Sequence, residues 1–379
     1  MYLKLIYCGG EIILKLKQKF YKKISFCLLF VFISISLIHT PAYCEKVKSK
    51  NYDLNARAAV VIDSKTNRIL FNKNAHDIVP MASTTKILTC LVALKYGNLD
   101  KKFTVSSKAS SIRGSKVGYK KSEEISLKEL LYGLMFKSGN DAAICIAEGI
   151  AGSTDEFCKL MNEYAREIGI LDSHFESPHG LDSQNHYSTA YDLALLTSKT
   201  KEIDFFNELS KTKNYSESGF SRSYQNINKI LYLVPEATGT KTGYTGQAGK
   251  CLVSSFNMGD NNEIIVVVLN CTPRWKSSEW LYNNTKELYE YKKVFNSNEI
   301  ILTETLENGI EIQGILKEDV IVPVKKGNEI KTIITLNENI KNTNIKEIEN
   351  FEYLGTLKIF ENEEQIYIVP ILNKNYKSM

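Results

Sequence analysis

The stretch MASTTKILTC, residues 81–90, places Ser83 three positions before Lys86, at the start of an apolar run. Two interpretations are open at this point: Ser83 is a helix cap with a stray lysine behind it, or the two side chains are a nucleophile and its base. Residues three apart share one face of a helix, so Ser83 and Lys86 are expected to meet. A serine hydroxyl is a good nucleophile only when a base takes its proton.

The S-x-x-K pattern alone is weak, because it recurs at Ser198–Lys201 and Ser210–Lys213. S-x-N, as in Ser138–Asn140, also recurs, whereas K-T-G occurs once, at Lys241–Gly243. The order of the three is the specific signal. S-x-x-K begins an apolar helix, S-x-N breaks a pair of predicted helices, and K-T-G lies on a predicted strand beside Gly-rich turns. This ordered set resembles the signature of penicillin-binding proteins and class A β-lactamases.

A lysine base must be neutral, yet a free lysine titrates at about 10.4. Burial among Ile87 and Leu88, the positive end of the helix and a second cation nearby would each lower the pKa of Lys86. Lys241 is the predicted cation, provided that its strand lies alongside. The hypothesis therefore requires Lys86 to be neutral when Ser83 attacks, and names Lys241 as the cause.

The other motif residues suit a peptide substrate. Ser138 is predicted to relay a proton to a leaving amine, and Asn140 to hold a substrate amide. Lys241 and Thr242 together suit a substrate carboxylate.

The predicted strand through Tyr244 offers backbone groups along its edge to an extended peptide. The backbone N–H groups of Ser83 and Tyr244 are predicted to bind the developing oxyanion. Gly243 lets the substrate approach the backbone closely.

The stretches STTKILT, SGNDAA, SPHGL and KTGYT resemble those of the low-molecular-mass penicillin-binding, serine-type D-alanyl-D-alanine carboxypeptidases. The resemblance covers about residues 54–295, and the β-rich tail fits the second domain of that family. It implies Ser83 as nucleophile, Lys86 as general base, Ser138 and Asn140 as second motif, and Lys241 as substrate anchor. It also implies removal of the terminal D-alanine from peptidoglycan stem peptides through an acyl-enzyme, with β-lactams acylating the same serine. No cofactor or metal is implied.

Two features depart from the family pattern. Relatives often end in an amphipathic membrane helix, whereas this chain ends in IYIVPILNKNYKSM, a strand and a polar stub, so membrane attachment stays open. Many relatives also carry an arginine that reads the substrate carboxylate. Arg274 is the candidate here, and a surface arginine is the alternative.

The expected fold is α+β, a β-lactamase/transpeptidase-like domain in which helices cover an antiparallel sheet. Strands are expected around a turn within 56–74 and as a hairpin over 250–272. Helices are expected at 83–96, on both sides of SGN, at 153–170 and 189–200, and over 277–295. Short β-rich runs beyond residue 296 predict a small all-β sandwich.

The N-terminus has lysines, then the apolar run 24–38, then small residues before Cys44, an order that predicts a secretory signal. An uncleaved signal anchor is the alternative. The predicted domains are 1–44 (signal peptide), 45–295 (penicillin-binding serine carboxypeptidase domain) and 296–379 (β domain), in an exported protein of the extracytoplasmic cell envelope. The net charge of +5 over 379 residues shows no nucleic-acid footprint. Scattered cysteines favour small buried side chains over disulfides, and only Cys251 and Cys271 are a pair worth checking.

The sequence disfavours three other functions and one other catalytic arrangement. A class A β-lactamase needs an acidic base in an E-x-x-L-N loop, and SPHGLDSQNHYS occupies that region instead. A wall-binding protein without turnover is disfavoured because all three motifs are intact. A zinc hydrolase built on His174, His179 and His186 lacks an HExxH or HxH pattern. A Ser-His-Asp triad lacks a G-x-S-x-G elbow.

Overall fold

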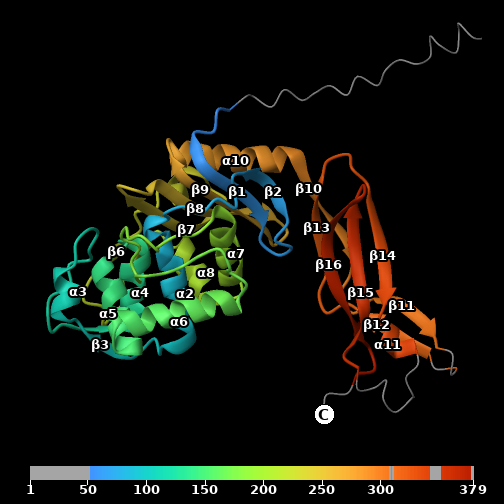
Figure 1. Cartoon of the computed structure of the whole chain (residues 1–379), viewed down its shortest axis with the longest axis horizontal. Coiled ribbons are helices and arrows are strands. Elements are labelled where there is room, and N and C mark those ends of the chain that lie inside the picture. The colour runs from blue at the N-terminus through green and yellow to red at the C-terminus, as the bar shows by residue number, and fades with distance from the viewer. Residues whose placement is uncertain (1–51, 307–308, 310, 342–350, 377–379) are drawn as a thin grey trace, which may run out of the picture. The chain divides into compact units, whose positions relative to one another are not determined.

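The computed structural model describes residues 52–306, 309, 311–341 and 351–376. The predicted signal peptide, 1–44, lies outside these residues. Within them, a mixed α/β part reaches to the helix α10, Arg274–Leu288, and is followed by strands of an all-β domain (Figure 1). The predicted α+β class with a C-terminal β domain is confirmed.

The mixed part is built on a five-stranded antiparallel sheet with strand order β2-β1-β9-β8-β7. Successive side chains of a strand point to opposite faces. In β1 this places Val60 and Ile62 in one apolar core and Val61 in a second, so both faces of the sheet are buried. The sheet strands are β1 (Ala56–Asp63), β2 (Ile69–Lys73), β7 (Ala237–Thr245), β8 (Gly249–Gly259) and β9 (Asn262–Cys271). The two predicted strand pairs, β1–β2 and β8–β9, are confirmed.

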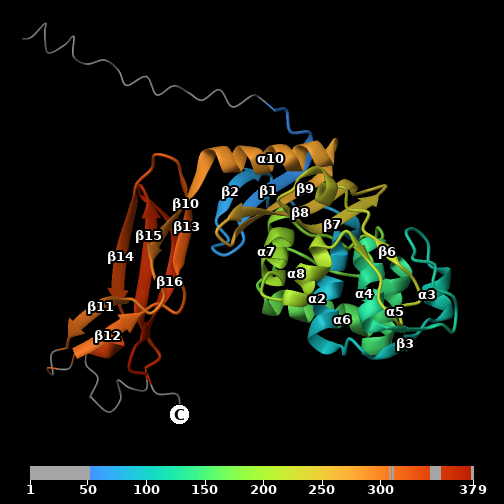
Figure 2. The ribbon, with the colours of Figure 1, turned by 180° about the vertical axis from the view of Figure 1, so that it is seen from behind.

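Helices cover the two faces unequally. The helix α10 lies over one face, where its Leu281 joins the smaller core with Ile230 of the short helix α9 (Ile230–Leu233), and the larger helices lie on the opposite side (Figures 1 and 2). On that side α2 (Lys86–Tyr96) is buried from Lys86 to Ala93, as its apolar sequence predicts. Around it lie α4 (Leu127–Phe136), α5 (Asn140–Ala151), α6 (Thr154–Glu167), α7 (Ala190–Thr200) and α8 (Asp204–Lys211). Smaller elements are η1 (Ala82–Thr85), α3 (Ser107–Ser111), α9 (Ile230–Leu233) and the strand pairs β3 (Lys102–Thr104) with β4 (Glu124–Ser126) and β5 (Asn214–Tyr215) with β6 (Tyr224–Gln225).

The C-terminal domain has a five-stranded sheet, order β11-β12-β16-β15-β14, and a β10–β13 pair that share one core of side chains such as Val322, Leu357 and Ile371. The predicted helix over 277–295 is wrong at its C-terminal end: α10 stops at Leu288, and Tyr289–Phe295 forms β10, which pairs with β13. Four of the seven residues of YEYKKVF are aromatic or β-branched, residue types that a strand accommodates well. The elements are β10 (Tyr289–Phe295), β11 (Ile300–Thr305), β12 (Glu311–Ile315), β13 (Val320–Lys325), β14 (Ile330–Leu336), α11 (Glu338–Lys341), β15 (Tyr353–Glu361) and β16 (Glu364–Asn373).

Two smaller observations complete the fold. Cys251 and Cys271, like the other three cysteines of the described residues, are buried free thiols, so the pair singled out in the sequence forms no disulfide. In the described part of the chain, every helix is too short or too polar to span a bilayer.

Candidate active site

The first motif occupies the junction between η1 and α2. Ser83 lies in the single 3-10 turn and Lys86 is the first residue of α2. The Lys86 ammonium nitrogen lies 2.9 Å from Ser83 Oγ, so the predicted i,i+3 contact is present. Lys86 is fully buried, whereas Ser83 is partly exposed. The serine is therefore reachable from outside, and its lysine is not.

The cap interpretation of Ser83 is wrong. Neither η1 nor α2 has a side-chain cap hydrogen bond, and Ser83 Oγ instead contacts the carbonyl oxygen of His179 at 3.3 Å. The reason is local geometry: a cap residue has extended backbone and precedes the first turn. Here Ser83 already lies inside a turn, which directs its hydroxyl toward Lys86.

The second motif lies in the tight connection between α4 and α5. Ser138 has a positive φ of 57°, and Asn140 is the first residue of α5. Asn140 Oδ1 accepts a hydrogen bond from Lys86 Nζ at 2.8 Å, so the first two motifs share one lysine. Both Ser138 and Asn140 are buried.

The third motif lies on β7, a sheet-edge strand that pairs only with β8 among the described strands. Lys241 Nζ donates to Ser138 Oγ at 3.0 Å and to Thr242 O at 3.0 Å, which joins the third motif to the second. A Cβ at Gly243 would lie 3.1 Å from Ser83 N, a tight contact, so glycine suits the close approach of β7 to the first motif. The side chain of Tyr244 is 68% exposed.

Arg274 lies against this strand. Its Nη1 donates to the carbonyl oxygens of Gly243, at 2.7 Å, and of Cys251, at 3.0 Å. Arg274 is therefore bound to the third motif, and its role toward a substrate carboxylate stays a prediction.

Burial dominates the electrostatics of both lysines. Desolvation first, and Lys241 second, hold the pKa of Lys86 well below its ordinary value, while Asp141 acts in the opposite direction. The sequence hypothesis named Lys241 as the cause of the low pKa of Lys86. Lys241 does contribute, but burial has the larger effect. Burial, followed by the charge of Arg274, lowers the pKa of Lys241 to about 7.

The contacts of Lys86 suit a neutral amine. Besides Ser83, its nitrogen has two acceptors, Asn140 Oδ1 and the His179 carbonyl oxygen, at 2.8 and 2.6 Å. A neutral amine has two N–H donors and one lone pair, so donation to these two acceptors leaves the lone pair available to the Ser83 hydroxyl.

Two of these participants were not found from the sequence. His179 contributes a main-chain carbonyl, for which side-chain identity gives no signal; only its place in SPHGL pointed to the region. Asp141, next to Asn140, binds backbone N–H groups of a distant loop, a contact that spacing along the chain does not indicate.

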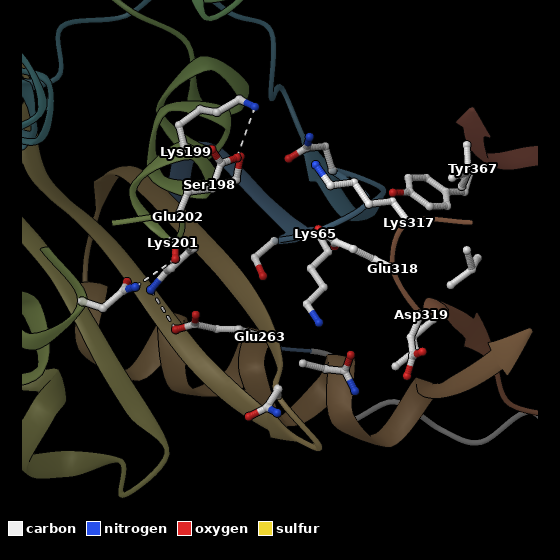
Figure 3. Close-up of a pocket in the computed structure, with 18 of the residues that line it drawn as sticks. Lys65, Ser198, Lys199, Lys201, Glu202, Glu263, Lys317, Glu318, Asp319 and Tyr367 are labelled. Atoms are coloured by element: carbon white, nitrogen blue, oxygen red, sulfur yellow. Dashed lines mark hydrogen bonds and ion pairs between the residues drawn. The ribbon is translucent and has the colours of Figure 1, made fainter. Parts of the chain in front are cut away.

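The other two S-x-x-K pairs are structural. Ser198 and Ser210 each donate to a main-chain carbonyl, and Lys201 bonds Ser255 Oγ at 2.9 Å and Glu263 at 2.8 Å. Lys201 and Glu263 line a cavity of about 830 Å³ that contains none of the three motifs (Figure 3). Unlike Lys86, Lys201 has a carboxylate partner, which raises its pKa against the effect of burial.

The three histidines weighed as zinc ligands bind separate partners. His186 Nε2 contacts Thr85 Oγ1 at 2.8 Å, His174 Nδ1 contacts Asn185 O at 2.6 Å, and His179 Nδ1 accepts from Leu181 N at 3.2 Å. The loop therefore packs beside the first motif, as the sequence interpretation that favoured packing predicts.

Comparison with known proteins agrees with this arrangement. The family profile of D-alanyl-D-alanine carboxypeptidase matches residues 45–272. The D-alanyl-D-alanine carboxypeptidase DacF of Bacillus subtilis is 31% identical over 334 residues, covering 84% of this chain and 85% of that protein. DacC of Escherichia coli is 35% identical over 239 residues, covering 60% of this chain and 59% of its own length.

Solved structures show the same fold. Penicillin-binding protein 5 of Haemophilus influenzae superposes with a TM-score of 0.75 at 24% identity, covering 86% of this chain and 98% of that one. The carboxypeptidase DacD of Francisella tularensis gives a TM-score of 0.65 at 28% identity, with 87% and 95% covered. With the profile and the DacF match, the chain belongs to the serine-type D-alanyl-D-alanine carboxypeptidases, the low-molecular-mass penicillin-binding proteins.

Proposed function

We propose that the chain removes the terminal D-alanine of peptidoglycan stem peptides through an acyl-enzyme on Ser83, with Lys86 as general base. The observation that carries this proposal is the 2.9 Å contact between Ser83 Oγ and a fully buried lysine nitrogen. Low pKa and direct contact are the two requirements for a lysine to take the proton of a serine hydroxyl.

In the proposed reaction, Ser83 Oγ bonds to the carbonyl carbon of the penultimate D-alanine, and its proton moves to Lys86 Nζ. The peptide C–N bond then breaks, and the leaving amine receives a proton. Ser138 suits this second transfer because its hydroxyl lies 3.0 Å from Lys241 Nζ, inside the same network. Water then hydrolyses the ester and releases Ser83.

The substrate is proposed to lie along the free edge of β7. Backbone groups from Lys241 to Tyr244 would pair with the extended peptide, and the N–H groups of Ser83 and Tyr244 would hold the oxyanion. The close approach of Gly243 to Ser83 N supports this placement.

The proposed anchors of the substrate are polar side chains of the second and third motifs. Lys241 and Thr242 would bind the terminal carboxylate, and Asn140 a substrate amide. Arg274 would support these anchors indirectly, because its hydrogen bond to the Gly243 carbonyl oxygen fixes the strand that carries Lys241 and Thr242.

We also propose that β-lactams acylate Ser83, because a strained amide presents the same carbonyl to the same nucleophile. A peptidoglycan substrate would be met outside the cytoplasmic membrane, to which the predicted export signal would also direct the protein. The domain boundary at 295/296 remains a prediction.

The test is to assay D-alanine release from a pentapeptide ending in D-Ala-D-Ala and to locate the penicillin adduct by mass spectrometry. We expect release of one D-alanine per peptide, and a lasting penicilloyl adduct on the peptide that contains Ser83. An adduct elsewhere would contradict the assignment of the nucleophile. Rapid penicillin turnover without an adduct would favour the β-lactamase alternative.

A further prediction concerns Lys241→Gln. This change removes the cation that lowers the pKa of Lys86, so that pKa rises. Since the base acts when neutral, the acid limb of the pH profile of the acylation rate shifts to higher pH. Because Lys241 is also the proposed partner of the terminal carboxylate, KM for a substrate with a free carboxylate rises by about tenfold or more. A pH–rate profile measures the shift. Lys201→Gln removes another buried lysine and is expected to leave the limb in place; a limb unmoved in Lys241→Gln would contradict the coupling.

A further inference from the structure

The loop between α3 and β4 is attached to the second motif by an unusual set of contacts. The carboxylate of Asp141 accepts hydrogen bonds from three consecutive backbone N–H groups of this loop, those of Val117 (3.0 Å), Gly118 (2.8 Å) and Tyr119 (3.2 Å). Asp141 is fully buried and also accepts from Ala142 N at 3.0 Å. One side chain thus fixes the path of the loop 113–119.

The same loop contacts Asn140. Asn140 N donates to Ser115 O at 2.8 Å, and Asn140 Nδ2 donates to Arg113 O at 2.7 Å. The amide of an asparagine can face either way, and its orientation follows from its hydrogen bonds. Because Arg113 O takes the NH₂ group, Oδ1 is left facing Lys86 Nζ, which it contacts at 2.8 Å.

Gly114 completes the contact. It has a φ of +85°, and a Cβ at this position would lie 2.8 Å from Asn140 Nδ2. The loop backbone therefore lies directly against the amide. A shift of the loop would move or turn the group that orients Lys86.

We infer that Asp141 is a positioning residue: it holds the loop 113–119 against Asn140, which in turn directs Lys86 toward Ser83. The inference rests on the proposed function, because it assigns Asp141 a role in acylation of Ser83. Misplacement of a catalytic group by about 1 Å costs up to about a hundredfold in rate.

The first test is Asp141→Asn. The NH₂ group of the asparagine replaces one carboxylate oxygen and cannot accept a hydrogen bond from the backbone N–H groups of the loop. We expect the acylation rate constant of a β-lactam at its pH plateau to fall by about tenfold to a hundredfold, with binding before acylation nearly unchanged. The matched control is Asp192→Asn, another buried carboxylate that accepts from a backbone N–H, Asp172 N at 2.9 Å. This control is expected to acylate within about twofold of wild type even if its melting temperature falls equally.

The pH profile separates positioning from charge. The negative charge of Asp141 raises the pKa of Lys86, so its removal alone would move the acid limb to lower pH and leave the plateau unchanged. A lowered plateau is the sign of misplacement. An unchanged plateau in Asp141→Asn would overturn the positioning role.

A second variant acts on the same contact without a change of charge and without loss of the buried carboxylate. Gly114→Ala places a methyl group against Asn140 Nδ2 and is expected to lower the plateau as well. Its control is Gly169→Ala: Gly169 is also exposed, with a φ of +84°, but has nothing within 4 Å of a Cβ. Equal acylation by the two alanine variants would overturn the proposal. A wild-type chain without an adduct on Ser83 would instead contradict the proposed function itself.

Discussion

Replacing Ser83 by alanine is expected to lower D-alanine release by at least about 10⁴-fold and to remove the β-lactam adduct. The reason is that no other described serine combines partial exposure with a contact to a buried lysine that lacks a carboxylate partner. The fold should be retained, because Lys86 keeps two acceptors, Asn140 Oδ1 and the His179 carbonyl oxygen. The measurements are the D-alanine assay, intact-protein mass after penicillin treatment, and the melting temperature.

The matched control for Ser83→Ala is Ser255→Ala. Ser255 also lies 2.9 Å from the nitrogen of a largely buried lysine, Lys201, but Lys201 is paired with Glu263. Ser255→Ala is expected to retain both the activity and the adduct. An adduct of undiminished yield in Ser83→Ala would show that the nucleophile lies elsewhere.

The fold was predictable from the sequence where the hydrophobic patterns are continuous. The apolar run AAVVI of β1 and the run EIIVVVLNC of β9 are short and rich in β-branched residues, as suits central strands of a sheet buried on both faces. The end of α10 was not predictable in this way. The aromatic and charged residues at 289–295 fit a helix and a strand alike. Hydrogen bonding to β13, which lies about 30 residues further along the chain, stabilises this segment as a strand.

The site was predictable where side-chain identity carries the chemistry. Three S-x-x-K pairs are present, and the presence of S-x-N and K-T-G further along the chain singles out Ser83–Lys86. The structure brings these three motifs into one hydrogen-bond network. It also explains the rejected pairs, since Lys201 has a carboxylate partner and Ser210 donates to the carbonyl of Thr238.

The contacts that the sequence did not predict are made by main-chain groups. The His179 carbonyl and the N–H groups bound by Asp141 belong to loops whose paths depend on packing, and every residue has the same backbone groups. The cap interpretation of Ser83 failed for a related reason. Whether a serine near a helix start caps the helix depends on its backbone angles, which residue type alone does not fix.

Replacing Lys86 by alanine is expected to lower the rate of Ser83 acylation by about 10³-fold, the usual contribution of a general base. The fold should be retained, because removal of the amine also removes the free-energy cost of burying it, which offsets the loss of its hydrogen bonds. Stopped-flow acylation with a chromogenic β-lactam and a thermal melt measure the two effects separately.

The control for Lys86→Ala is Lys201→Ala, and the two variants should behave in opposite ways. Lys201→Ala leaves the largely buried Glu263 carboxylate without its ion-pair partner, so the melting temperature should fall while acylation stays within about twofold of wild type. Among the described residues, Lys86 has no carboxylate within hydrogen-bond reach, since its contacts are with a hydroxyl, an amide oxygen and a carbonyl oxygen. Burial without a hydrogen-bonded carboxylate favours the neutral form of a lysine, and a neutral amine beside a serine hydroxyl can take its proton. Near-native acylation by Lys86→Ala would therefore refute the assignment of the base while leaving that of Ser83 intact.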